Sequence, residues 1–427
     1  MLVPDGVTVE DYSNALAEEE FTHARVTFIM DNIVFEDAEL YQGGIVVSTY
    51  MNPDDSMSFG VAYSTEVVVR FLRSDKTENM NFAREFTLEF GVDINGETKW
   101  VTMGHFFGKR SVLAENDTVE LTAYDKMTRF DRDAADFIAT LSFPLTIGDI
   151  YDALCEFCVV DNTSGDEIAS VMSRNITNLD DFQTESCRVL LSKIAEANCC
   201  YAKINNDGEM QLIWFDDCTE DQTLLRDNCF GYKIIKLEKS YSKKWEMIEE
   251  YKWKDLENMQ YSDYDNNNNP FDYSNVRLTW IEDGDQGEEK HEIVQPPLDE
   301  LFGNKLWANV ENFLWENVES LKWKEFEASE DINGNMYTID NNPFVLYETE
   351  ADTKAHLQLI LDKLYDFHLY YVATVEMVGN WLIEPGDIVT LEVANNVFTS
   401  YPIFNRVLTW NGACVCSYET TGSLTVS

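Results

Sequence analysis

The chain has 427 residues, 44% of them hydrophobic and 13% aromatic, so it is too long for one ordinary core and too apolar for a disordered protein. Its 78 acidic and 31 basic side chains give a formal net charge of −47, which excludes nucleic-acid binding that depends on a cationic groove. No apolar run reaches the roughly 18 residues that a membrane-spanning helix needs, and residues 1–12 lack the basic and apolar regions of a secretion signal.

The acidity has two interpretations. It serves solubility or reflects a salt-adapted host, or it marks a surface or lumen that repels DNA rather than binding it. The residue types alone leave both open.

Residues 22–131 are rich in strand signals, with Val, Ile, Phe and Thr in short alternating runs. Asn95-Gly96 predicts a two-residue hairpin, because both turn positions take positive φ. The expected strands are residues 25–29, 44–49, 66–72, 85–94, 101–107 and 118–123. This pattern predicts an antiparallel barrel or sandwich.

In residues 143–215 the apolar side chains recur at helical spacing instead of alternating. Thr146 is a good N-cap with Asp149 in the capping-box position, ahead of an apolar stripe that ends at Cys158. A second stripe covers residues 187–198, and residues 200–204 and 210–215 form a hairpin around Asn206-Asp207-Gly208. The segment predicts a compact α+β unit.

Residues 232–295 are polar and irregular, with strands expected at 233–237 and 276–280 and a weaker helical stripe at 306–321. In the last part, Thr353 or Asp352 is expected to cap a helix over 357–364. The strands expected after it are residues 369–378, 388–393, 398–405, 406–410 and 413–418, the last pair joined at Asn411-Gly412. These strands again predict a barrel.

The nine cysteines are the first candidates for chemistry, and several lie inside apolar patterns, which favours reduced thiols in a protein assembled in the cytosol. Cys155 and Cys158 have metal-site spacing, but no second such pair completes four ligands. We therefore expect buried thiols there, and core packing for Cys414 and Cys416, which share one face of a strand.

The sequence contains no nucleophile elbow, HExxH or P-loop motif, and its five histidines are isolated. Acidic pairs are too common for a glycosidase pair to be identified. The sequence thus predicts no catalytic residue, no cofactor and no metal site.

Three stretches resemble phage baseplate hub and tail-tip proteins. Residues 101–147, which contain TAYDKM and FPLT, are similar to that family's junction between a barrel and an inserted domain. Residues 186–215 resemble the inserted domain itself. The order of Asn342-Pro343, Glu384-Pro385-Gly386-Asp387 and residues 402–422 resembles the end of a second barrel.

The resemblance implies a mainly β protein with two tube-like antiparallel β-barrels and an α+β insert. The implied domains are a first barrel (1–135), an α+β insert (136–230), an irregular mixed domain (231–345) and a second barrel (346–427).

It further implies a non-enzymatic, homotrimeric structural protein in a virion tail or phage-like particle, assembled in the bacterial host cytoplasm. Three chains would supply six barrels that join a sixfold tail tube to a threefold tip. The implied partners are a tail tube or distal tail protein, a tape-measure protein and a tip or spike protein, and DNA would pass through the lumen without specific binding.

Two alternatives belong to other classes. One is a tail-associated peptidoglycan hydrolase or peptidase, although the second-barrel pattern ends so near residue 427 that little room is expected for a catalytic domain. The other is a receptor- or glycan-binding tail protein, which 10 Trp and 20 Tyr residues would suit.

Overall fold

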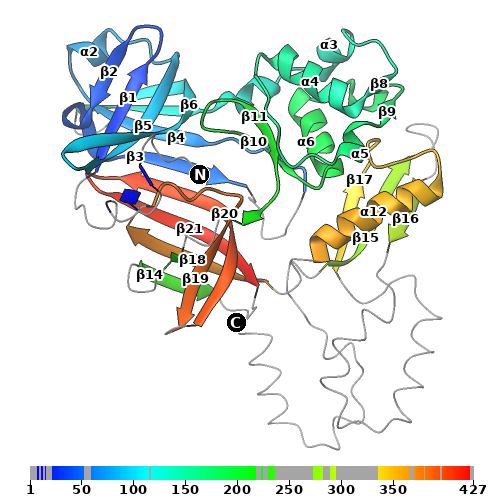
Figure 1. Cartoon of the computed structure of the whole chain (residues 1–427). Coiled ribbons are helices and arrows are strands. Elements are labelled where there is room, and N and C mark those ends of the chain that lie inside the picture. The colour runs from blue at the N-terminus through cyan, green and yellow to red at the C-terminus, as the bar shows by residue number, and fades with distance from the viewer. Residues whose placement is uncertain are drawn as a thin grey trace, which may run out of the picture. The chain divides into compact units, whose positions relative to one another are not determined.

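The contacts of the chain divide it into two compact units in the computed structural model (Figure 1). Unit 1 comprises Met1–Lys236 and Tyr371–Ser427, and unit 2 is Leu237–Tyr370. The finer division into four domains stays a prediction. The structure describes residues 7–8, 11–12, 15, 22–51, 59–114, 117–217, 223–224, 229–235, 273–281, 289–294, 335–365, 370–378, 380–394 and 397–423.

Unit 1 is built on a 14-stranded sheet in which all pairings are antiparallel except those of two short strands, β12 and β13, with β19. Its strands are β1 (His23–Phe28), β2 (Ile33–Glu36), β3 (Leu40–Tyr50), β4 (Glu66–Leu72), β5 (Glu85–Ile94), β6 (Glu97–Ala114), β7 (Thr118–Tyr124), β12 (Asp216–Asp217), β13 (Thr223–Leu224), β14 (Cys229–Ile235), β18 (Tyr370–Val378), β19 (Asp387–Ala394), β20 (Val397–Trp410) and β21 (Cys414–Ser423). Two short helical turns, η1 (Asp37–Glu39) and α2 (Asp75–Glu78), connect strands of this sheet.

The strand order is β14-β18-β21-β20-β3-β4-β7-β6-β5-β1-β2, with β19 pairing β20 beside this path. Within the described residues this sheet does not close into a barrel. No strand pairing joins β14 to β2, and none closes the strands before or after the β3–β20 pair into a ring of their own. The prediction of a mainly β fold is therefore confirmed as one large antiparallel sheet.

The N-terminal and C-terminal β-rich segments meet where β3 pairs with β20, in a register that runs from Ile45 opposite Trp410 to Tyr50 opposite Asn405. In Figure 1 this is the place where the blue β3 lies beside the red β20. The two β-rich segments, which lie far apart in the sequence, thus share a hydrogen-bonded ladder.

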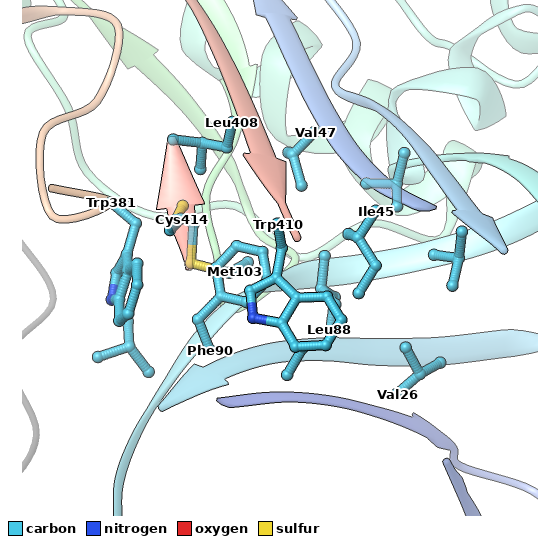
Figure 2. Close-up of a cluster of buried hydrophobic side chains, with 14 of the residues drawn as sticks. Val26, Ile45, Val47, Leu88, Phe90, Met103, Trp381, Leu408, Trp410 and Cys414 are labelled. Atoms are coloured by element: carbon cyan, nitrogen blue, oxygen red, sulfur yellow. The ribbon is translucent and has the colours of Figure 1, made fainter. Parts of the chain in front are cut away.

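The same two segments also share a hydrophobic core. Figure 2 shows Trp410 of β20 in one cluster with Ile45 of β3 and with Leu88 and Phe90 of β5. All four side chains are almost wholly buried. Alternation along each strand produces this arrangement, since every second side chain points to the covered face.

The α+β segment of unit 1 lies between the two β-rich parts of the sequence. Its elements are η3 (Lys126–Phe130), α3 (Ala134–Ile138), β8 (Leu145–Thr146), α4 (Ile147–Cys158), α5 (Ala169–Met172), β9 (Asn175–Ile176), η4 (Asp180–Phe182), α6 (Cys187–Ala197), β10 (Tyr201–Ile204) and β11 (Met210–Ile213). As predicted, Thr146 caps α4 in a capping box with Asp149, and β10 pairs with β11 as a hairpin.

Unit 2 contains a three-stranded sheet of order β16-β15-β17, in which β15 and β17 run parallel. Its strands are β15 (Tyr273–Ile281), β16 (Glu289–Val294) and β17 (Asn335–Asp340). The helix α12 (Glu350–Tyr365) packs on β15 and β16 and buries Leu357, Ile360 and Leu361.

Several expected element boundaries were wrong. The hydroxyl of Thr349, not Thr353 or Asp352, caps α12 by accepting from the Asp352 amide at 3.1 Å, so the helix begins earlier. β20 is one continuous strand where two were expected, β6 is longer than expected, and β2 was missed because it is only four residues long.

The hairpin at Asn411-Gly412 forms, but only Gly412 has positive φ and Trp410 pairs with Cys414. Its loop therefore has three residues. The helical stripe at 306–321 lies outside the described residues.

Candidate functional site: a buried junction in unit 1

The described part of the chain holds no group of three His, Cys, Asp or Glu side chains placed to bind a metal ion. Nor does any described helix have the length and apolar character needed to cross a bilayer. The predictions of no metal, no cofactor and no catalytic residue stay predictions. Unit 1 contains a buried junction, the region where residues 59–65, β10–β11 and residues 381–394 and 397–406 meet.

The first contact in the junction is between backbones. The Gly60 amide donates to the Cys200 carbonyl at 2.9 Å, the Ala202 amide to Val61 at 3.0 Å and the Tyr63 amide to Ala202 at 3.3 Å. Residues 60–63 thus pair with the edge of β10 opposite to β11. The N-terminal β-rich part and the α+β segment are joined by main-chain hydrogen bonds, which do not depend on side-chain identity.

Gly60 is required by this contact for two reasons. Its φ is +78°, in the left-handed region where side chains are strained. A Cβ there would also lie 2.5 Å from the Ser192 carbonyl oxygen and 2.6 Å from the Glu196 Cβ, both on α6. No side chain fits between this segment and the helix.

A charged cluster lies at the centre of the junction. Glu384 accepts a hydrogen bond from the Asn206 amide nitrogen at 3.0 Å, and its carboxylate lies 3.6 Å from Lys203 Nζ and 3.9 Å from Arg406 Nη2. Burial is the largest single influence and raises the pKa of Glu384, but the positive charges of Lys203 and Arg406 together with the Asn206 hydrogen bond contribute to lowering that pKa below its usual value. The carboxylate is therefore ionised and links β10 to β20.

Arg406 also binds the backbone of the segment that precedes β19. Its Nη1 donates to the carbonyl oxygens of Trp381 at 3.2 Å and Ile383 at 2.8 Å, and the side chain is 3% exposed. The Glu384 amide in turn donates to Asp387 at 2.8 Å. A buried guanidinium with carbonyl and carboxylate partners fixes the turn that feeds β19.

Asp125 plays a similar part where β7 ends. Its carboxylate accepts from the Ser64 hydroxyl and the Thr65 amide, both at 2.7 Å, and from the Met127 amide at 3.0 Å. Burial raises the pKa of Asp125 to about 6, against the lowering effect of these three hydrogen bonds. The side chain joins the end of residues 59–65 to the start of η3.

Aromatic rings complete the junction. The ring centroid of Phe59 lies 5.0 Å from that of Trp214, and Trp214 stacks on Tyr201 with ring centroids 6.0 Å apart. The Phe215 ring centroid lies 4.7 Å from that of Phe404 of β20. The three parts of unit 1 thus contact one another through rings as well as charges. Offset and edge contacts of this kind add to the free energy gained from burial.

Sequence reasoning identified several of these segments without their partners. It placed a hairpin turn at Asn206-Asp207-Gly208 and singled out TAYDKM and Glu384-Pro385-Gly386-Asp387 for their resemblance to tail proteins, and the structure brings all three to the junction. It missed Lys203, Arg406 and Gly60. Arg406 could have been found from the sequence, because it is a lone positive charge within an apolar strand pattern. A charge at such a position is expected to be buried and to need hydrogen-bonding partners.

The expectations for the cysteines are confirmed where the structure describes their side chains. Cys155, Cys158, Cys414 and Cys416 are free thiols and at most 1% exposed. Cys218 and the Cys229 side chain lie outside the described part of the structure.

No family model matches the sequence, and no curated protein matches it. Solved structures do match. A 43 kDa tail protein of prophage MuSo2 from Shewanella oneidensis superposes with a TM-score of 0.51 at 9% identity, covering 94% of this chain and 97% of that one. A tail protein from Neisseria meningitidis MC58 superposes with a TM-score of 0.52 at 9% identity, covering 94% and 96%.

The chain has the fold of phage tail proteins. The similarity spans nearly the whole length of both partners, so it covers more than the sheet alone. At 9% identity it establishes the tail-protein fold and leaves function to be argued from the structure. The resemblance found in the sequence is confirmed at that level.

Proposed function

We propose that this chain is a non-enzymatic structural protein of the baseplate hub or tail tip of a phage or phage-like particle. It acts as a homotrimeric adaptor between a sixfold tail tube and a threefold tip. Its location is the virion tail, and its partners there are a tail tube or distal tail protein, a tape-measure protein and a tip or spike protein.

The pairing of β3 with β20 carries this proposal. It fixes the N-terminal and C-terminal β-rich parts in one orientation through six paired positions, from Ile45 with Trp410 to Tyr50 with Asn405. A ring built from such chains needs the two parts of each copy to keep a constant angle. Three copies then present six β modules around one rotation axis.

In this proposal each β-rich part is a tube-like barrel module, and residues 22–131 and 366–427 superpose. Closure of the modules involves neighbouring copies, because β2 and β14 end the strand path in the described sheet. An exposed end strand presents unpaired amide and carbonyl groups that another chain can cover. The α+β insert (136–230) and the irregular mixed domain (231–345) are the remaining two domains.

The charge of −47 fits a conduit. Acidic side chains on the inner surface of the ring repel DNA phosphates, so DNA passes without specific binding. Screening limits this repulsion to about 8–10 Å at physiological salt, so only acids close to the lumen contribute.

Light scattering on the purified protein, alone and with a tail-tip partner, tests the assembly. A trimer is expected in at least one condition, and a cryo-EM map of the particle should contain a ring with two β modules per chain. A monomer in both conditions together with no ring in the particle would contradict the proposal. Cell-wall lysis in a zymogram would instead favour the hydrolase alternative, and selective glycan-array binding the receptor alternative.

The conduit has its own test. Acidic side chains that line the channel in that map are changed in pairs to Lys, and DNA release from the particle is timed. Glu156 in α4 and Asp161 just after it, both exposed, supply a matched control with the same change in charge. Slower release for the channel variants alone supports the conduit, whereas equal release contradicts it.

A further inference from the structure

The second half of β6 has a strand partner on one side only. Strand β6 pairs with β5 through residues 97–107 and with β7 through residues 107–114. On the β5 side, the Gly108 amide still contacts the Arg84 carbonyl at 3.5 Å. Beyond that contact, no described strand pairs with residues 109–114 on the side opposite β7. This segment, called the β6 edge below, can therefore offer backbone hydrogen bonds to an extended segment of another chain.

Two adjacent cations lie on the β6 edge. Lys109 and Arg110 are both exposed, and neither forms an ion pair with another described residue. Other cations of the described sheet do have such partners, as Arg25 has in Glu89 at 2.7 Å. The chain carries 78 acidic and only 31 basic side chains, so a carboxylate is easily found for a surface cation. An adjacent basic pair without one is thus placed to meet acidic groups from outside the chain.

Leu113 adds an apolar side chain to the same edge. It pairs with Val119 of β7, which pairs in turn with Phe71 of β4. Phe71 is fully buried and Val119 packs against the core, but Leu113 is 67% exposed. The apolar row that starts in the core therefore ends in solvent at the β6 edge. Charged residues can protect a strand edge from unwanted pairing, but an exposed leucine gives no such protection and gains burial only when another chain docks.

We propose that the β6 edge is a docking site for an extended, acidic segment of a second copy of this chain, in the homotrimer proposed above, on which this inference rests. The net charge of −47 makes the surface of a second copy a suitable partner for Lys109 and Arg110. Main-chain hydrogen bonds supply affinity in such strand addition, and the two cations select an acidic partner.

The same charges decide the symmetry of the contact. Two β6 edges placed side by side would bring one Lys109-Arg110 pair close to the other, and like charges at an interface oppose association. The edge therefore meets a different surface of the next copy, which is a heterologous contact. Contacts of this kind form a closed ring when the rotation between copies closes, whereas edge-to-edge pairing would give a twofold dimer.

Photo-crosslinking tests the edge directly. Benzoylphenylalanine replaces Leu113 in the full-length chain, and in a control preparation it replaces Val159, which is 69% exposed and lies outside the sheet. Each protein is irradiated in the light-scattering condition that gives a trimer, and the products are analysed by mass spectrometry under denaturing conditions. Position 113 should give a product of twice the chain mass, linked to an acidic peptide, and position 159 should not.

Charge reversal gives a second readout. Lys109→Glu combined with Arg110→Glu should weaken self-association by about tenfold or more, and added salt should weaken association of the wild type. The control is Lys99→Glu combined with Lys354→Glu, which makes the same change in charge at side chains that are 31% and 46% exposed. It should associate as the wild type does. Circular dichroism checks that each variant is folded, and the crosslink at position 113 stands even if a charge variant fails to fold.

The outcomes separate this inference from the hub proposal. A trimer in which position 113 links no two copies, or links only to a tail-tip partner, overturns the docking edge and leaves the hub proposal standing. A folded charge-reversal variant that associates as tightly as the wild type also overturns the docking edge. If no condition gives a trimer, both proposals fail.

Discussion

The indole N–H of Trp410 donates to the carbonyl oxygen of Thr22 at 3.2 Å, joining positions that are 388 residues apart in the chain. The Thr22 amide donates in turn to the Gly412 carbonyl at 2.9 Å. The turn between β20 and β21 is thereby fixed to the start of β1. Because Trp410 also fills the shared core, one side chain joins the two β-rich parts by packing and by hydrogen bonding.

Trp410→Phe separates these two contributions. The phenyl ring keeps much of the buried area but leaves the buried Thr22 carbonyl without this donor, so we expect a loss of about 1–2 kcal/mol. Trp410→Ala also removes the ring from the core and should cost about 3–5 kcal/mol. Urea unfolding followed by circular dichroism measures both. Equal losses for the two variants would mean that the ring does not contribute to a shared core.

Gly60→Ala tests the contact between residues 59–65 and α6. The added methyl group meets the Ser192 carbonyl and Glu196, and the residue keeps a positive φ, so the free energy of unfolding should fall by about 3 kcal/mol. Gly96→Ala is the matched control, because its φ is +83° and a Cβ there meets nothing within 4 Å. It should cost only about 1 kcal/mol of backbone strain. Similar losses for the two variants would indicate that residue 60 is not packed against the helix.

Glu384→Gln tests the charged cluster. Glutamine keeps the size and an acceptor for Asn206 but leaves Lys203 and Arg406 without a compensating charge. We expect a loss of about 2–3 kcal/mol, somewhat below that of a fully buried pair because the Glu384 side chain is 18% exposed.

The control is Glu97→Gln, which removes a carboxylate paired with Lys99 but 76% exposed, and it should have no measurable effect on stability. The double variant Glu384→Gln with Lys203→Met should cost less than the sum of the two single changes. Additive losses would show that Lys203 and Glu384 do not interact.

Asp125 predicts a specific dependence of stability on pH. Its pKa is about 6 in the folded chain and near its ordinary value of about 3.9 once unfolded. As the pH rises from 4 to 6, the unfolded carboxyl loses its proton first, so the contribution of Asp125 to stability falls over this window and stays constant above it. Two pKa units correspond to a change on the order of 2–3 kcal/mol.

The measurement compares wild type with Asp125→Asn in urea unfolding at several pH values between 4 and 8. Other carboxyl groups titrate alike in both proteins, so the difference between the two isolates Asp125. The wild-type stability should fall relative to the variant between pH 4 and 6. A difference that stays constant, or one that changes in the opposite direction, would contradict the buried position of Asp125.

The sequence by itself determined the local elements of this protein. Alternating apolar residues gave β4 and β5 at their observed bounds, since burial of every second side chain is a property of the strand alone. Thr146 with Asp149 gave the start of α4, and Asn95-Gly96 gave a hairpin, because caps and turns depend on the few residues that form them.

Only the tertiary structure decided how these elements combine. Nothing in the spacing of Ile45 or Trp410 states that β3 pairs with β20, because alternation specifies a covered face and not the partner strand. The same holds for Glu384, whose carboxylate is an ordinary charge in the sequence until the fold brings Lys203 Nζ and Arg406 Nη2 within 4 Å of it. Contacts between distant segments are selected by packing and electrostatics summed over the whole unit, which a local pattern does not contain.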